Sequence, residues 1–105
     1  MFARSVTIHL KSNSVSEFNN TMEKDILPLL QKQKGFRDEI SLVTSNGSEA
    51  VGISLWDQKE DAEAYSRTTY SEVQTFLARV SEGAPQVKTY EVGISTIHKT
   101  SARGA

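Results

Sequence analysis

Two runs of alternating side chains meet at an Asn-Gly pair in the stretch FRDEISLVTSNGSEAVGISLW, from Phe36 to Trp56. Alternation is typical of β-strands, because successive side chains of a strand point to opposite faces of its sheet. Asn-Gly between two such runs is the strongest short signal for a β-hairpin, since these residues tolerate the positive φ angles of tight turns. We therefore predict two antiparallel strands over residues 36–44 and 49–56.

A strand and an amphipathic helix are expected before the hairpin. Residues 2–10 alternate, and one face of this predicted strand carries Phe2, Val6, Ile8 and Leu10. Apolar side chains then recur at three- and four-residue steps, which is the pattern of a helix with one buried face. They are Val15, Phe18, Met22, Ile26, Leu29 and Leu30.

Local signals predict the two ends of this helix and an irregular turn inside it. Ser14 and Glu17 have the spacing of a capping box, and Gly35 is expected to form the C-terminal cap. Pro28 lies inside the helix and has no N–H to donate. We therefore expect the helix to bend or to loosen by one turn near Pro28.

Two shorter helices and a last strand are predicted after the hairpin. Asp57 is expected to cap the first helix, whose inner face carries Ala62 and Tyr65. Thr69 opens the second helix, and its apolar side carries Val73, Phe76, Leu77 and Val80. Gly83 and Pro85 are expected to stop that helix, with a strand following over residues 87–97.

The order of elements is β-α-β-β-α-β, with the second helix broken in two. This order predicts an α+β, ferredoxin-like fold, in which a four-stranded antiparallel sheet carries its helices on one face. A chain of 105 residues suits one domain. We expect that domain to span residues 1–98, followed by a patternless C-terminal tail over residues 99–105.

Composition excludes several classes of function. The chain has 12 basic and 13 acidic residues and no cysteine. A formal net charge of -1 offers no field to attract nucleic acid or an anionic membrane, so neither partner is expected. No apolar stretch is long enough to span a membrane, and the first residues alternate instead of forming a signal peptide. Together with the lack of cysteine, this favours a cytoplasmic protein.

Neither face of the predicted sheet has the charged character of a solvated surface. One set of side chains comprises Phe2, Val6, Ile8 and Leu10 with Val51, Ile53 and Leu55. The other set comprises Ala3, Ser5, Thr7, Ser41, Val43, Gly52 and Ser54. Parity alone does not fix which set meets the helices, but the open face needs a cover. A second copy of the chain would supply it, which predicts a homodimer. The alternative is a thin monomer with a mildly polar open face.

Three stretches give the chain a resemblance to a known family. They are DILPLLQKQKGFRDE (25–39), the Asn-Gly hairpin, and SLWDQKEDAEAY (54–65). In these features the chain resembles the antibiotic biosynthesis monooxygenase (ABM) family of the dimeric α+β barrel superfamily. The resemblance implies a homodimer with facing sheets and a pocket in each subunit between sheet and helices. Members include cofactor-independent monooxygenases of polycyclic quinol-type substrates, quinol oxygenases and haem-degrading enzymes, and many members have no established activity.

Small side chains on the sheet could leave the space for this pocket. The tetrapeptide VGIS occurs at residues 51–54 and again at 92–95. Gly52 and Ser54, and likewise Gly93 and Ser95, remove volume from the sheet surface. A cavity above the backbone is one interpretation, and close approach of a helix or of a partner sheet is the other. In the family, the tryptophan at the place of Trp56 lines the substrate pocket. The alternative for Trp56 is a core side chain where strand meets helix.

Oxygenation without a cofactor needs little from a protein beyond a desolvated site and a group that stabilises an anion. Arg4, on the first strand, is the candidate cation, although an arginine at a strand end can also extend into solvent. We predict Arg4 and Trp56 as catalytic residues. The predicted substrate-binding residues are Phe18, Gly52, Ser54, Tyr65, Tyr70 and Phe76. His9 could act as a base but lies on the face opposite Arg4.

Haem and metal chemistry fit the sequence poorly. Haem-degrading members of the family use an asparagine on the first strand and an iron-binding histidine on the following helix, and the chain matches neither. His9 and His98 are the only imidazoles, so no metal site and no cofactor is expected. A GxSxG motif is also absent from the sequence, which argues against a serine hydrolase.

The predicted function is therefore ABM-type, cofactor-independent oxidation of a small aromatic or quinol-like molecule. The alternative is a non-catalytic homodimer that binds a hydrophobic small molecule, because one fold can host both activities.

Overall fold

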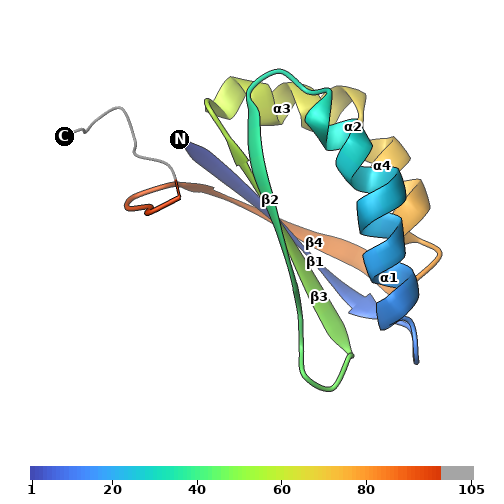
Figure 1. Ribbon diagram of the computed structural model, residues 1–105. Coiled ribbons are helices and arrows are strands. Elements are labelled where there is room, and N and C mark those ends of the chain that lie inside the picture. Colours follow the sequence, from blue (N-terminus) through green and yellow to red (C-terminus); the bar gives the residue numbers. More distant parts are fainter. Residues whose placement is uncertain (98–105) are drawn as a thin grey trace.

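A four-stranded antiparallel sheet carries the helices on one of its faces in the computed structural model, which describes residues 1–97 (Figure 1). The elements follow the chain as β1 (Phe2–Leu10), α1 (Val15–Thr21), the π-helical turn η1 (Met22–Ile26), α2 (Leu27–Gln31), β2 (Phe36–Val43), β3 (Glu49–Trp56), α3 (Lys59–Thr68), α4 (Tyr70–Leu77) and β4 (Ser81–Glu91). The strands lie in the order β2-β3-β1-β4. This confirms the α+β, ferredoxin-like order predicted above. His98 and the predicted tail lie outside the described residues.

The hairpin forms where the Asn-Gly pair predicts it. Gly47 has a φ of 73°, in the left-handed region that favours glycine. The backbone N–H of Gly47 donates to the Thr44 carbonyl at 2.9 Å, and the Asn46 side-chain oxygen accepts from the Ser48 N–H at 3.0 Å. The pair of Thr44 and Glu49 closes the loop. Since strand pairing continues inward from this pair, the loop fixes which residues of β2 and β3 face each other.

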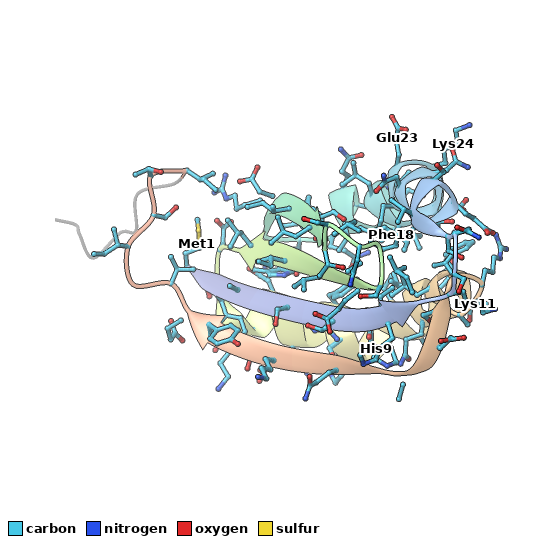
Figure 2. The ribbon with its side chains drawn as sticks, turned by 90° about the horizontal axis from the view of Figure 1, so that it is seen from below. Met1, His9, Lys11, Phe18, Glu23 and Lys24 are labelled. Carbon is cyan, nitrogen blue, oxygen red and sulfur yellow. The ribbon has the colours of Figure 1, made fainter. Side chains whose placement is uncertain are left out.

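The helix that contains Pro28 is loosened as expected. The turn η1 is π-helical, and Pro28 lies in the first turn of α2, directly after it. A wider turn relieves the clash between the proline ring and the carbonyl four residues earlier. Figure 2 shows Phe18 pointing toward the sheet, whereas Glu23 and Lys24 point away from it.

Three predicted helix caps are wrong in detail. Ser14 occupies the N-cap position of α1, but its hydroxyl donates to the Ser12 carbonyl at 3.4 Å and caps nothing. Gln58, not Asp57, is the N-cap residue of α3, and the Asp57 carboxylate forms an ion pair with Arg37 on β2. Gly35, with a φ of 79°, lies in the turn before β2, since α2 already ends at Gln31.

The predicted bounds of the last strand are also wrong. β4 begins at Ser81 and ends at Glu91, so Gly83 and Pro85 lie inside the strand instead of ending a helix. β4 is an edge strand, where the missing N–H of proline is tolerated, and its pairing with β1 shifts register beside Gly83. The second VGIS, residues 92–95, therefore follows β4: the Val92 N–H still donates to the Met1 carbonyl at 2.9 Å, but Gly93 and Ser95 lie beyond the strand. A Cβ added at Gly93 would meet no atom within 4 Å.

Strand register corrects the sorting of the two faces. Arg4 pairs with Ser54, and Val6 pairs with Gly52, so these four side-chain positions share the face under the helices. Val51 and Ile53 lie opposite Thr7 and Ser5 on the other face, not with Val6 and Ile8 as parity suggested. Parity within one strand is insufficient because a one-residue change in register moves every side chain to the other face.

Within residues 1–97, no helix is long and apolar enough to cross a lipid bilayer.

Candidate functional site

A cavity of about 40 Å³ lies between the sheet and the helices. Its walls are mainly apolar, and the polar groups that reach it belong to Arg4, Glu39, Ser54, Tyr65 and Tyr70. The roof includes Met22 and Ile26 of the π-helical turn. One water molecule needs roughly 10–15 Å³ of such space, whereas ligand pockets commonly have about 300–1,000 Å³. In this conformation the cavity admits a few waters, and a ring would enter only if the helices moved outward.

Arg4 is a buried cation in this cavity. Its exposed fraction is 5 %, so it does not extend into solvent. The guanidinium carbon lies 4.0 Å from the centre of the Tyr70 ring and 5.4 Å from that of Tyr65. In the described part of the chain, no carboxylate oxygen lies within 4.0 Å of it. The two ring faces compensate the charge only partly, which leaves the cation available to an anionic group.

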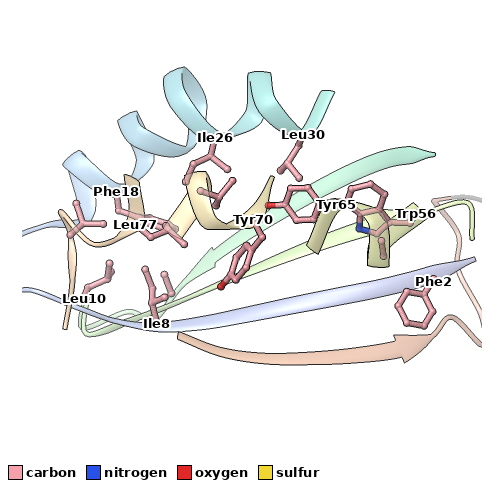
Figure 3. Packing of buried hydrophobic residues seen from close by; sticks show 14 residues of the cluster. Phe2, Ile8, Leu10, Phe18, Ile26, Leu30, Trp56, Tyr65, Tyr70 and Leu77 are labelled. Atoms are coloured by element: carbon pink, nitrogen blue, oxygen red, sulfur yellow. The ribbon is translucent and has the colours of Figure 1, made fainter. Parts of the chain in front are cut away.

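Three aromatic side chains follow one another from the end of β3 into the cavity (Figure 3). The ring centres of Trp56 and Tyr65 are 5.2 Å apart, and those of Tyr65 and Tyr70 are 6.2 Å apart. Trp56 is fully buried, and its indole N–H donates to the Ser54 hydroxyl at 2.8 Å. Tyr65, not Trp56, forms the wall of the cavity, and Trp56 supports Tyr65 from behind.

The two tyrosine hydroxyl groups remain neutral near pH 7. Burial raises the pKa of Tyr65 and of Tyr70, and the nearby Arg4 charge opposes this rise. The buried Tyr70 hydroxyl lies close enough to the Arg4 guanidinium for Arg4 to lower its pKa, but among residues 1–97 it has no hydrogen bond of normal geometry. Buried polar groups are normally satisfied, so this hydroxyl is available to a ligand or a water in the cavity.

Glu39, on β2, is a site residue that the sequence interpretation missed. Its half-buried side chain reaches the cavity over Gly52, and a Cβ added at Gly52 would lie 2.8 Å from its Oε2 atom. Burial raises the pKa of Glu39 to about 8, and the Arg4 charge opposes this effect. The hairpin loop could have revealed the residue, because pairing inward from Thr44 and Glu49 places Glu39 opposite Ser54.

Most of the predicted substrate-binding residues line the cavity, but Phe76 does not. Phe18, Gly52, Ser54, Tyr65 and Tyr70 line the cavity, and their role in binding a substrate stays a prediction. The Phe76 ring is instead half-buried beside the Arg79 guanidinium, at 5.2 Å. His9 is exposed and does not line this cavity (Figure 2). No group of three or more potential metal ligands occurs in residues 1–97.

Solved structures of similar fold include oxygenases and proteins of unknown function. A monooxygenase from the gene ActVA-Orf6 of Streptomyces coelicolor, in complex with nanaomycin D, matches with a TM-score of 0.76 and 12% identity over 90% of this chain and 88% of that one. SnoaB, a cofactor-independent oxygenase from Streptomyces nogalater, matches with a TM-score of 0.72 and 13% identity over 92% of this chain and 97% of that one. NE2512 of Nitrosomonas europaea, a protein of unknown function, matches with a TM-score of 0.73 and 12% identity over 90% of this chain and 91% of that one.

No protein-family model matches the sequence, and no curated protein matches it by sequence. Structures named as putative antibiotic biosynthesis monooxygenases from Bordetella bronchiseptica and Deinococcus radiodurans also match across most of the chain. The similarity lies in the three-dimensional arrangement, since the identities are low. The chain has the α+β fold of the antibiotic biosynthesis monooxygenase structures, as its sequence resemblance predicted.

Proposed function

We propose that this protein oxidises a small phenol or hydroquinone with molecular oxygen and without a cofactor. The observation that carries the proposal is Arg4: a buried cation, stacked on Tyr70, that faces a cavity and has no carboxylate within 4.0 Å among the described residues. A phenolate oxygen is an anion that such a site would stabilise.

The chemistry requires the substrate to become an electron-rich anion. A phenol that has lost its hydroxyl proton can give electrons to oxygen directly. One oxygen atom then enters the ring and the other leaves as water, so a phenol becomes a quinone and supplies all four electrons. The protein's part is to bind the ring, exclude water and hold the negative charge beside Arg4. The neutral hydroxyl groups of Tyr65 and Tyr70 supply two further donors at the cavity wall.

The size of the cavity restricts the substrate. At about 40 Å³ it must widen even for one ring, and a polycyclic ring system would require a much larger movement of the helices. We therefore propose a monocyclic substrate. The π-helical turn η1 lies over the cavity, and Tyr70 begins a separate short helix, so this layer consists of short segments that can shift.

A non-catalytic binder of the same molecules is the second candidate. It is supported by a cavity whose chemistry suits binding as well as turnover, since one fold can host both.

Oxygen consumption with a panel of monocyclic phenols and hydroquinones distinguishes the two candidates. We expect saturable oxygen uptake by the wild type and a decrease of about 10²–10³-fold in kcat for Arg4→Gln, the usual effect of removing one group that stabilises an oxyanion. Arg67→Gln, an exposed arginine of α3, is the matched control and should retain activity. Saturable binding without oxygen uptake would support the binder, and the absence of both would contradict either function.

A further inference from the structure

Arg4 and Glu39 lie in one row across three strands of the sheet. Arg4 on β1 pairs with Ser54 on β3, and Ser54 pairs with Glu39 on β2. Paired residues of an antiparallel sheet place their side chains on the same face, with Cβ atoms about 4.5–5.5 Å apart. The cation and the carboxyl group therefore stand on either side of one small residue, beneath the helices.

Arg4 and Glu39 do not contact each other directly. Within residues 1–97, Arg4 and Glu39 form no ion pair within 4.0 Å, although they interact electrostatically. The Ser54 hydroxyl is directed elsewhere: it accepts from the Trp56 indole and donates to the Arg4 carbonyl at 3.3 Å. A polar atom of a ligand can therefore lie above Ser54 and contact both ends of the row.

Gly52 leaves the space that the Glu39 carboxyl group occupies. A Cβ at residue 52 would lie 2.8 Å from Oε2 of Glu39, closer than real Cβ contacts allow. Glycine is thus required here for the position of the carboxyl group, since φ of Gly52 is not in the left-handed region. The small residues of the first VGIS hold open the space in which Glu39 and a ligand would meet.

We propose that Glu39 accepts the proton of a substrate hydroxyl group that lies above Ser54 and faces Arg4. The substrate O–H bond breaks, and the proton forms an O–H bond with the Glu39 carboxylate. The electron pair remains on the substrate oxygen, which becomes a phenolate beside the Arg4 guanidinium. This assignment rests on the proposed function, because it names the group that begins the oxidation.

The ionisable groups around the cavity favour Glu39 for this role. Arg4 from β1 is permanently charged, and Tyr65 from α3 and Tyr70 from α4 have raised pKa values. The facing residues of β3, Gly52 and Ser54, do not titrate, and the proline-bearing helix contributes apolar side chains alone. With a pKa of about 8, Glu39 holds a proton more tightly than an ordinary carboxylate does. Its pKa is therefore closer to that of a phenol, about 10, which makes proton transfer from the phenol less unfavourable.

The test is the binding of 4-chlorophenol without oxygen, at a pH about one unit above the pKa of Glu39, where the free probe is mainly neutral and Glu39 is ionised. The ultraviolet spectrum reports whether the bound probe is an anion. Calorimetry in buffers of different ionisation enthalpy counts the protons released. We expect the wild type to bind the anion with almost no proton release, because the proton moves to Glu39. In Glu39→Gln the bound probe should remain neutral, or should release about one proton per anion formed.

Two further variants complete the experiment. Gly52→Ala should displace the flexible end of Glu39 and shift proton release toward that of Glu39→Gln, with the fold checked by circular dichroism. Glu63→Gln, an exposed residue of α3, is the matched control and should behave as the wild type. A bound probe that stays neutral in the wild type, or a wild type that releases as many protons per bound anion as Glu39→Gln does, would overturn the assignment alone. Failure of the wild type to bind phenols at all would overturn the proposed function with it.

Discussion

At the scale of single residues, the carboxyl group of Glu39 couples folding to pH. Burial raises its pKa to about 8 in the folded protein, whereas an exposed glutamate titrates near 4.3. Between these values the folded protein retains a proton that the unfolded chain loses, so the free energy of unfolding decreases as pH rises. Below this range both states are protonated, and above it both are ionised.

We expect Glu39→Gln to flatten this dependence. Urea unfolding at pH 5 and at pH 8 should show a clear decrease in stability for the wild type and a smaller decrease for Glu39→Gln, because glutamine does not titrate. Glu63→Gln should keep the wild-type decrease, since Glu63 is exposed. Parallel profiles for the wild type and Glu39→Gln would show that the carboxyl group is not buried as described.

Residue types in the sequence indicated much of the site, but not its geometry. Arg4, Gly52 and Ser54 were identifiable because a charge and two small residues interrupt apolar strands, and the structure places all three at the cavity. Glu39 was missed because acidic residues of an edge strand are usually solvated. Trp56 was expected in the cavity wall, but Ser54 binds its indole N–H and Tyr65 covers its face.

At the scale of elements, two glycines with the same backbone conformation allow a matched comparison. Gly35 and Gly83 have φ values of 79° and 75°. A Cβ at Gly35 would overlap the Asp61 carboxylate on α3, whereas a Cβ at Gly83 would meet no atom within 4 Å. Gly35 therefore lets the turn after α2 approach α3 closely, in addition to its backbone role.

We expect Gly83→Ala to lower the free energy of unfolding by about 1–2 kcal/mol, the usual cost of the left-handed conformation in a residue with a Cβ. Gly35→Ala should cost more, because Asp61 must also move. Asp61→Ala in the Gly35→Ala background should recover only part of the difference, because the Cβ of residue 61 would still lie 2.7 Å from the new Cβ. Chemical denaturation of the four proteins measures this. Equal losses for the two single glycine variants would contradict a close contact between this turn and α3.

The errors in element bounds share one physical cause. Gly83 and Pro85 end helices in most contexts, but at an edge strand proline loses no necessary hydrogen bond and glycine accommodates a change of register. Whether a strand is central or at an edge depends on tertiary pairing, which local sequence does not contain. The Asn-Gly hairpin and the loosened turn before Pro28 depend on local chemistry, and both were predicted correctly.

At the scale of the whole molecule, the face of the sheet away from the helices exposes apolar side chains of β2, beside polar ones of β1 and β4 such as Thr7 and Lys88. Ile40 and Leu42 of β2 are 36 % and 50 % exposed, and they pair with Ile53 and Val51 of β3 on the same face. Tyr90 of β4 is 51 % exposed. A contiguous apolar patch on a sheet is typical of an interface, and the fold favours a second copy of the chain as its cover.

We expect a dimer, with twice the 11.6 kDa mass of the chain, in size-exclusion chromatography with light scattering at micromolar concentration. Leu42→Lys should give a monomer, because it places a charge in the proposed interface without disturbing a buried position. Glu23→Lys, on the outer surface of η1, should remain dimeric. A wild-type protein that elutes as a monomer under these conditions would contradict the proposed dimer.

The central claim is that the cavity between Arg4 and Glu39 binds a small phenol. A crystal structure of the protein with 4-chlorophenol tests it most directly. We predict the ring beneath the π-helical turn, with its oxygen within about 3.2 Å of the Arg4 guanidinium and of the Glu39 carboxyl group, and the helices displaced outward. A ring bound on the open face of the sheet, or in the cavity without contact to Arg4, would contradict the account.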